Sequence, residues 1–412
     1  MTRGTRKRLL FINNRFPFPI EMGIDARVIN LLAVFSQKID LDFVCLADQE
    51  NSFNYIPELK KYCRHLEAFL VPNRKSMLHR LLYKIMFVLS YLFRGTPSHL
   101  FYTSLSEIKK RILNLIRNNS YDIIFFEYWF WDKELIQACN GLKVIDTNDV
   151  QFIRESKIQE RKAFPLLKPF IKFQMYRYKK KELERMKLFD LIIATREEDR
   201  ETFHRFLGSQ KKTIIFPTGV DTDYFSPRVL RSAEKTVTFY GAMSSNMNID
   251  GALYLYRKIM PFIWEQQKDA KLMILGSNPP SEIRALASDP RVTVTGYVKD
   301  VRDYLAMGTV VTLPLRMEYG HRGRIFEVMS MAIPIVLTPQ VVQGMEIRNG
   351  EGLLIEDSPQ SFARAVLNLL DDQGYAVELG MKGRKAVIER FSVQATYDRM
   401  IDFLVEYIHT RN

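Results

Sequence analysis

Two arginines stand among glycines shortly after an apolar run that ends near residue 315. Gly320 and Gly323 flank the first, Arg322, and Arg324 directly follows the second glycine. Glycine lets a backbone approach a ligand closely, and arginine is a permanent cation whose guanidinium suits phosphate. We expect a helix to begin here, so its N-terminal amides would also favour an anion. The segment is suited to hold a diphosphate.

A carboxylate accompanies these cations on the same expected helix. Glu327 lies three residues after Arg324, which places both side chains on one helix face. A carboxylate at this reach suits the paired hydroxyls of a sugar. The same spacing is also that of a plain surface ion pair, and the residues alone leave both interpretations open.

Another candidate loop follows the apolar run 291–296. Gly296, Tyr297 and Val298 lie where that predicted strand ends. They form either a ligand-binding loop or an ordinary turn in which Asp300 caps the next helix. The two roles are compatible.

The first half of the chain has candidates near the start of an expected helix. Gly23 precedes a helix that should begin near Asp25, and Arg27 lies on it. Such a glycine turn lets a phosphate or sugar approach the helix N-terminus, or it is only a turn. Arg27 faces either a ligand cleft or the solvent.

Acidic and amide side chains end two further apolar runs of the first half. Glu127 ends the run 121–127, and Asn148 and Asp149 follow Asp146 after the next run. Glu127 is either an acceptor contact or a buried structural carboxylate. Asp149 either lines a cleft or caps the helix that follows.

The elements that must position these residues are short apolar runs that alternate with amphipathic stretches. Continuous apolar strands separated by helices indicate parallel sheets covered on both faces, so we expect two doubly wound α/β domains. Open sheets of this kind bind ligands at the carboxyl ends of their strands, where the candidates lie. The runs are 8–12, 41–47, 121–127, 143–147, 190–195 and 213–217, followed by 236–241, 271–276, 291–296, 309–315, 333–338 and 352–356.

A turn-rich segment divides the two sets of strands. Residues 216–235 are rich in Pro, Gly and Asp, which end one sheet before the next begins. We therefore expect domains at 1–220 and 221–392, followed by an amphipathic helix at 393–412.

The segment PLRMEYGHRGRIFEVMSMAIPIV (314–336) resembles the donor-binding signature of glycosyltransferase family 4, which comprises retaining nucleotide-sugar transferases with the GT-B fold. Further resemblances occur in order along almost the whole chain. Two departures concern the donor: Tyr319 stands where many relatives have a glutamate, and the loop GAMSSNMN lacks the usual cations. The further matches are FINNRFPFPIEMGIDARVINLL (11–32), DLIIATREEDRETF (190–203), PTGVDTDYFSP (217–227), YGAMSSNMNIDGALYL (240–255) and RVTVTGYVKDVRDYLAMGTVVTLPLR (291–316).

The resemblance implies two Rossmann-like domains that face each other across a cleft, with the last helix packing back toward the first domain. The first domain would bind the acceptor and the second the nucleotide-sugar donor. Arg322 and Arg324 would then meet the donor diphosphate, and Glu327 its ribose, as the catalytic set. The other donor contacts would be Gly241, Gly296, Tyr297, Val298, Gly320 and Gly323, and the acceptor side would be Gly23, Arg27, Glu127, Asn148 and Asp149.

By the same resemblance, the reaction would be a retaining, hexosyl-type transfer to a glycan or lipid-linked acceptor in surface polysaccharide biosynthesis. We expect no metal and no cofactor, because the three cysteines lie far apart and the six histidines form no ligand pattern. Two alternatives remain: a non-hydrolysing sugar-nucleotide epimerase, and a non-catalytic protein that binds membranes or nucleic acid.

The charge of the chain is unevenly distributed. Of the 412 residues, the first 220 hold 38 Lys and Arg against 24 Asp and Glu, and the remainder 22 against 23. A basic half suggests an anionic partner. We expect a membrane surface, because no nucleic-acid-binding pattern occurs.

Two basic stretches, 77–97 and 161–187, would make that membrane contact. In the alternative interpretation, their apolar stripes belong to the protein core and their cations form a solvated face. The longest apolar stretch, 85–93, is much shorter than the roughly 20 residues that span a bilayer. We therefore expect a cytoplasmic protein, peripheral on the inner face of the cell membrane.

Overall fold

The computed structural model describes residues 6–20, 23–47, 49–71, 106–162, 168–228, 234–243, 245–316, 323–343 and 345–411. The chain forms two compact units. The first comprises Met1–Pro217 with Tyr397–Asn412, and the second comprises Thr218–Thr396. The domain boundaries expected after residues 220 and 392 stay predictions.

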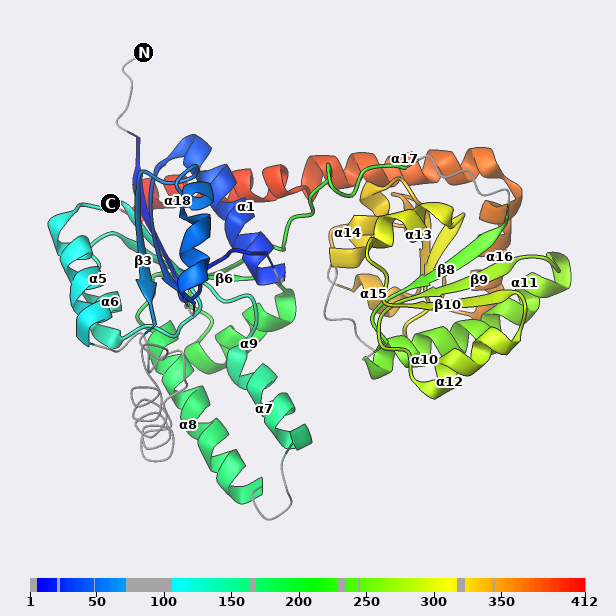
Figure 1. The fold of residues 1–412 in the computed structure, drawn as a ribbon, viewed down its shortest axis with the longest axis horizontal. Helices are drawn as coiled ribbons and strands as arrows, with labels where there is room; N and C mark the ends of the chain where they lie inside the picture. The colour runs from blue at the N-terminus through cyan, green and yellow to red at the C-terminus, as the bar shows by residue number, and fades with distance from the viewer. Residues whose placement is uncertain are drawn as a thin grey trace. The chain divides into compact units, whose positions relative to one another are not determined.

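The first unit contains a seven-stranded parallel sheet in the order β3-β2-β1-β4-β5-β6-β7. Helices lie on both sides of the sheet (Figure 1), which explains why most strands are apolar along their whole length. Successive strands run outward from β1 to β3, and the chain then returns to place β4 on the other side of β1. This reversal creates a topological switch point between β1 and β4. The strands are β1 (Arg8–Asn13), β2 (Asp40–Ala47), β3 (His65–Leu70), β4 (Ile123–Glu127), β5 (Leu142–Asp146), β6 (Leu191–Ala194) and β7 (Thr213–Ile215).

The helices of this unit follow the βα alternation expected of a doubly wound sheet. The helices are α1 (Gly23–Lys38), η1 (Glu50–Tyr55), α2 (Ile56–Leu59), α5 (Ser106–Asn118), α6 (Lys133–Gln137), α7 (Gln151–Lys162), α8 (Lys168–Met186), α9 (Glu197–Leu207) and α18 (Val393–Arg411), the last of which begins in the second unit.

One strand of the first unit was absent from our expectation. β3 has the sequence HLEAFL, and most of it is half-buried or exposed. It lies at the edge of the sheet, where one side of the strand meets solvent and polar residues are tolerated. It therefore lacks the continuous apolar run that marks the other strands.

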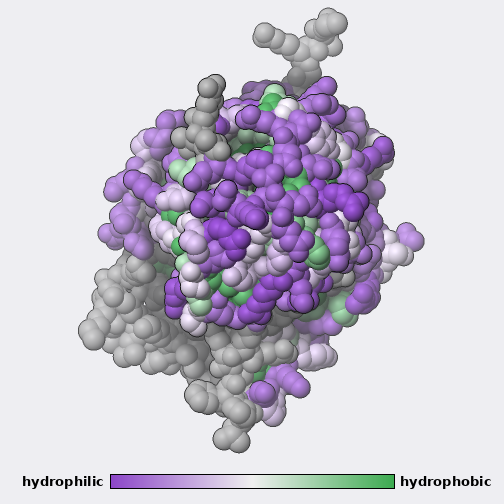
Figure 2. Space-filling view, turned by 90° about the vertical axis from the view of Figure 1, so that its right-hand side faces the viewer, coloured by the Kyte–Doolittle hydropathy of each residue, from purple (hydrophilic) through white to green (hydrophobic). Residues whose placement is uncertain are grey.

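The second unit contains a six-stranded parallel sheet in the order β10-β9-β8-β11-β12-β13, and its six strands match the six expected runs. Its switch point lies between β8 and β11. The face in Figure 2 is mostly hydrophilic, with hydrophobic side chains in small scattered groups, as on an ordinary solvated surface. The strands are β8 (Thr236–Tyr240), β9 (Lys271–Leu275), β10 (Val292–Gly296), β11 (Val310–Leu313), β12 (Ile335–Leu337) and β13 (Leu353–Ile355). The helices are α10 (Asn246–Tyr254), η5 (Leu255–Ile259), α11 (Met260–Gln266), α12 (Ser281–Arg284), η6 (Ala285–Ser288), α13 (Val301–Met307), α14 (Gly323–Ser330), α15 (Pro339–Val342), α16 (Pro359–Asp371) and α17 (Gln373–Arg390).

The C-terminal helix α18 packs in the first unit from Tyr397 onward. Its acidic side chains pair with the end of α1: Lys38 Nζ lies 3.0 Å from Asp398 Oδ1 and 2.8 Å from Asp402 Oδ1. This confirms the expected return of the last helix to the first domain.

The basic stretches lie partly within the described chain. The stretch 77–97 falls outside the described residues, whereas most of 161–187 forms α8, which packs beside α7 (Figure 1). Among the described helices, none has the length and apolar character that crossing a membrane requires.

Candidate functional site

In the second unit, the candidate donor residues gather at the switch point. Gly241 follows β8, and Arg324 stands in the first turn of α14, which comes after β11. Arg324 Nη1 donates to the carbonyl oxygen of Tyr240 at 2.6 Å, and its Nη2 donates to Asn248 Oδ1 at 2.9 Å. A Cβ on residue 241 would lie 1.8 Å from Arg324 Nη1, so only glycine permits this approach.

Glu327 joins the same group of residues. The hydroxyl of Tyr240 donates to Glu327 Oε2 at 3.1 Å. Burial raises the pKa of Glu327, while the bond from Tyr240 and the charge of Arg324 act to lower it. Glu327 is thus partly buried and hydrogen-bonded to a residue at the end of β8. A plain ion pair on the helix surface would need neither feature.

Two residues of this group have roles that sequence reasoning missed. Tyr240 positions Glu327, and Asn248 accepts from Arg324 while its Nδ2 donates to the carbonyl oxygen of Ala242 at 2.7 Å. In the sequence, both residues lie in the segment 240–255. Their residue types do not reveal which groups they bind.

The loop after β10 has the geometry of a capped strand-end turn. Gly296 has a φ of +68°, and Tyr297 is 80% exposed. Asp300 Oδ1 accepts from the amide of Arg302 at 3.0 Å, which confirms that Asp300 caps α13. Contact of Gly296, Tyr297 and Val298 with a nucleobase stays a prediction.

Two members of the predicted donor set, Arg322 and Gly320, lie outside the described residues. Gly323 is the first residue of α14, and a Cβ there would meet no atom of another described residue within 4 Å. Anion binding at the N-terminus of α14 stays a prediction.

In the first unit, Arg27 is a buried cation. Only 1% of it is exposed, which excludes the solvent-facing alternative. Its Nη2 and Nε donate to Asp146 Oδ2 at 2.7 and 2.9 Å. Arg27 therefore joins α1 to the carboxyl end of β5.

Glu127 lies beside this ion pair. Strand register places it opposite Asp146, and Asn148 Nδ2 donates to its Oε1. Burial, followed by the charge of Asp146, raises the pKa of Glu127 well above its ordinary value, although Arg27 and Asn148 act to lower it. Glu127 Oε2 and Asp146 Oδ1 are buried and have no hydrogen-bond partner among the described residues. These strand ends thus form a charged cluster with unused acceptors.

The backbone at this cluster takes an uncommon form. Asn148 has a φ of +52° and Tyr128, which follows Glu127, a φ of +60°. Asparagine tolerates this left-handed region better than most residues. Both chain segments therefore turn sharply where the two strands end.

The remaining acceptor-side candidates lie on neighbouring loops. Gly23 begins α1. Asp149 Oδ1 lies 3.4 Å from Arg196 Nη2. The first amides of α7 donate instead to the carboxyl group of Glu182 on α8, from Gln151 at 3.0 Å and from Phe152 at 2.7 Å. Burial raises the pKa of Glu182 to about 8, against these amide bonds. Nothing in the sequence pointed to this capping across helices.

No group of three or more His, Cys, Asp or Glu side chains suited to a metal ion occurs in the described part of the chain.

Comparison with known proteins finds a family similarity within the second unit. Residues 234–372 match the family described as glycosyl transferases group 1. A curated relative, the GDP-mannose-dependent alpha-(1-6)-phosphatidylinositol monomannoside mannosyltransferase of Mycobacterium tuberculosis, is 27% identical over 244 residues. That alignment spans 52% of this chain and 61% of the relative's length.

Solved structures resemble nearly the whole chain at low sequence identity. Sucrose-phosphate synthase from Thermosynechococcus elongatus is 16% identical, with a TM-score of 0.59 over 98% of this chain and 100% of its own. Anabaena HepE in complex with UDP and glucose is 12% identical, with a TM-score of 0.57 over 96% and 99%. These likenesses confirm the predicted fold of two Rossmann-like α/β domains. In fold and in the matched segment, the chain is similar to the GT-B glycosyltransferases.

Proposed function

We propose that this chain is a glycosyltransferase that transfers a sugar from a nucleotide-diphosphate donor to a glycan or lipid-linked acceptor. The observation that carries the proposal is the junction of Arg324, Gly241, Tyr240 and Glu327 at the switch point of a unit that matches glycosyl transferases group 1. Ligands of open α/β sheets bind at such points.

The chemistry follows from the charges at this junction. Bond cleavage at the anomeric carbon leaves negative charge on the departing nucleoside diphosphate. Arg324 and the N-terminal amides of α14 would stabilise that charge, together with Arg322. Glu327, in its ionised form, would accept hydrogen bonds from the ribose hydroxyls. Since fixed cations and amides supply the stabilisation, we propose that the transfer needs neither a metal nor a cofactor.

The acceptor side is proposed to be the charged cluster of the first unit. Glu127 and Asp146 are fully buried, so the half-buried Asn148 and Asp149 beside them would contact the hydroxyl groups of a sugar or a polyol headgroup. The curated relative uses GDP-mannose and a phosphatidylinositol mannoside, as its name states, so this pair is the first to try. We further propose that transfer retains the anomeric configuration and serves surface polysaccharide synthesis.

The uneven charge supports a location for this reaction. With 38 basic against 24 acidic residues, the first 220 residues would be attracted to an anionic membrane. We therefore propose that the protein works in the cytoplasm, at the inner face of the cell membrane.

A thermal-shift screen of UDP-, GDP- and CMP-sugars tests the donor assignment. We expect one nucleotide class to stabilise the protein, and we expect this shift to vanish in Arg324→Ala and in Glu327→Ala. Lys258→Ala, an exposed cation of the same unit, is the matched control and should keep the shift. A folded protein that responds to none of these donors would refute the proposal.

Product analysis distinguishes the reaction classes. Incubation with donor and acceptor in the presence of EDTA should yield a glycoside whose anomeric configuration, read by NMR, equals that of the donor. Conversion of the donor to an epimer without any acceptor would instead identify an epimerase. Loss of the reaction in EDTA would contradict the metal-free mechanism.

A further inference from the structure

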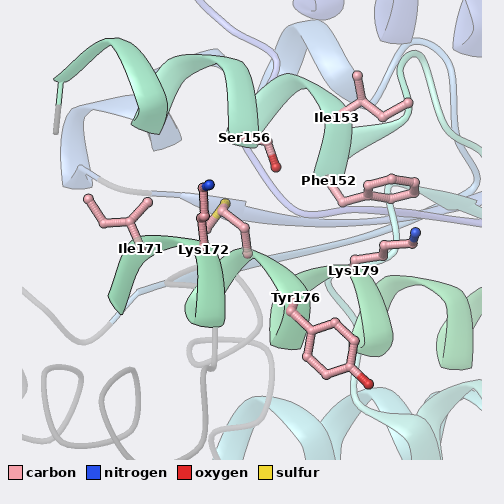
Figure 3. A pocket seen from close by; sticks show the side chains of 8 residues that line it. Phe152, Ile153, Ser156, Ile171, Lys172, Tyr176 and Lys179 are labelled. Carbon is pink, nitrogen blue, oxygen red and sulfur yellow. The ribbon is translucent and has the colours of Figure 1, made fainter. Parts of the chain in front are cut away.

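A groove runs between helices α7 and α8 of the first unit. Its volume is about 440 Å³, within the range of small-ligand sites. In Figure 3, Ser156 of α7 and Lys172 of α8 point toward each other across this space. The residues that line it are Phe152, Ile153, Ser156, Ile171, Lys172, Met175, Tyr176 and Lys179.

The lining is apolar with a cationic component. Half of the eight described lining residues are aliphatic or aromatic hydrocarbon side chains or methionine, two are lysines and none is acidic. Lys172 is exposed, and no hydrogen bond or ion pair joins it to another described residue. Its charge is therefore available to an anion.

The shape of the lining favours an aliphatic ligand over a flat one. Phe152 is only 7% exposed, and its ring already contacts the ring of Phe206 at 5.7 Å. Lys179 Nζ lies 3.5 Å from the centre of the Phe206 ring. Tyr176 is 65% exposed and points away from α7 in Figure 3. No open aromatic face among these residues is placed to stack on a base, whereas a hydrocarbon chain needs only apolar walls.

Helix α8 also carries a row of exposed aromatic residues, of which Tyr176 lines the groove. Phe170, Phe173 and Tyr176 follow one another at intervals of three, on one face of the helix, and are 41%, 56% and 65% exposed. Aromatic side chains interleaved with cations are typical of surfaces that enter lipid headgroups. α8 thus lines the groove and also carries an exposed aromatic face suited to meet a membrane.

We propose that the α7–α8 groove binds one alkyl chain of an anionic lipid, with Lys172 at its charged headgroup. This deepens the proposed membrane and acceptor contact and rests on that proposal for its biological role. Binding itself is measured without any sugar transfer.

Calorimetric titration of the full chain with decyl phosphate, below its critical micelle concentration, tests the groove. We expect saturable binding that weakens on the order of tenfold for every two methylenes removed from the chain. Decanol should bind several-fold more weakly because it lacks the charge, and inorganic phosphate should not bind measurably. Equal affinity for phosphate and decyl phosphate would overturn the proposal.

Matched variants locate the site. Lys172→Glu should weaken decyl phosphate at least tenfold, whereas Lys180→Glu, the same charge change on an exposed α8 residue outside the groove, should change affinity less than threefold. Ser156→Phe should block the groove and abolish binding. If both lysine variants weaken binding equally, or if Ser156→Phe binds normally while folded by circular dichroism, the groove is not the site.

Donor binding separates this proposal from the glycosyltransferase assignment. The groove belongs to the first unit and the nucleotide junction to the second, so Lys172→Glu should leave the thermal shift by the donor nucleotide unchanged. If the wild-type chain responds to the donor nucleotide but does not bind decyl phosphate, the groove proposal fails and the glycosyltransferase assignment stands.

Discussion

The residue type at position 241 decides whether the Arg324 guanidinium can reach the end of β8. Arg324 Nη1 donates to the carbonyl oxygen of Tyr240, and the absent Cβ of Gly241 leaves the space that this contact needs. Gly241 thus has a steric role at the site, independent of backbone freedom.

Gly241→Ala should displace the Arg324 guanidinium and weaken nucleotide-sugar binding at least tenfold. The new Cβ would lie 1.8 Å from Nη1, so one of the two groups must move. A donor titration in the wild type, both single variants and the double variant measures the effect. In an Arg324→Ala background, the same glycine substitution should add little, because the clashing group is gone. Additive losses would show that the clash is not the cause.

Tyr240→Phe should shift the pH dependence of donor binding. In the proposed role, Glu327 binds ribose hydroxyls when ionised, so affinity would be present above its pKa and would be lost as pH falls through it. The Tyr240 hydroxyl bond lowers that pKa, which burial raises, and its removal should move the loss of affinity to higher pH. Donor dissociation constants between pH 5 and 9 give the profile. Tyr256→Phe, in the same unit, should keep the wild-type profile.

At the scale of elements, α7 depends on a carboxylate from α8. Glu182 accepts from the amides of Gln151 and Phe152, which are among those that no helical carbonyl can satisfy. The carboxyl group is completely buried. This bond fixes the two helices that form the groove.

Glu182→Gln should remove a pH dependence of stability. The pKa of Glu182 is raised to about 8 in the folded chain, from an ordinary value near 4.5. A raised folded pKa gives stability that is complete below the unfolded pKa and is lost as pH rises through the folded one. The wild-type free energy of unfolding should thus fall by a few kcal/mol between about pH 4.5 and 8. Urea unfolding of the variant across this range should show a smaller fall, and an equal fall would refute the assignment.

The sequence was sufficient for strands buried on both faces, because a continuous apolar run such as that of β4 marks them. It failed for β3, where an edge position admits polar residues. For the site, the sequence predicted which residues lie at the ends of strands, as with Gly241 and Glu127. The hydrogen bonds of Tyr240, Asn148 and Glu182 could not be predicted, because each bond joins elements whose proximity only the folded chain establishes.

At the scale of the whole molecule, one buried cation touches both points where the chain passes between the units. The first unit ends at Pro217 and resumes at Tyr397. Arg27 Nη1 donates to the carbonyl oxygen of Pro217 and to the hydroxyl of Tyr397, each at 3.4 Å. Arg27 thus holds the outgoing and returning segments against Asp146 of β5.

Arg27→Met should destabilise the first unit by about 3–5 kcal/mol, because it leaves the Asp146 carboxylate buried without its counter-ion. Asp146→Asn in the same background should restore part of this loss by removing the unpaired charge. Tryptophan fluorescence during urea unfolding reports the change in a Trp264→Phe background, since the remaining two, Trp129 and Trp131, are buried in the first unit. If the double variant is no more stable than Arg27→Met, the loss of stability comes from lost packing around Tyr397. The unpaired charge of Asp146 is then not its cause.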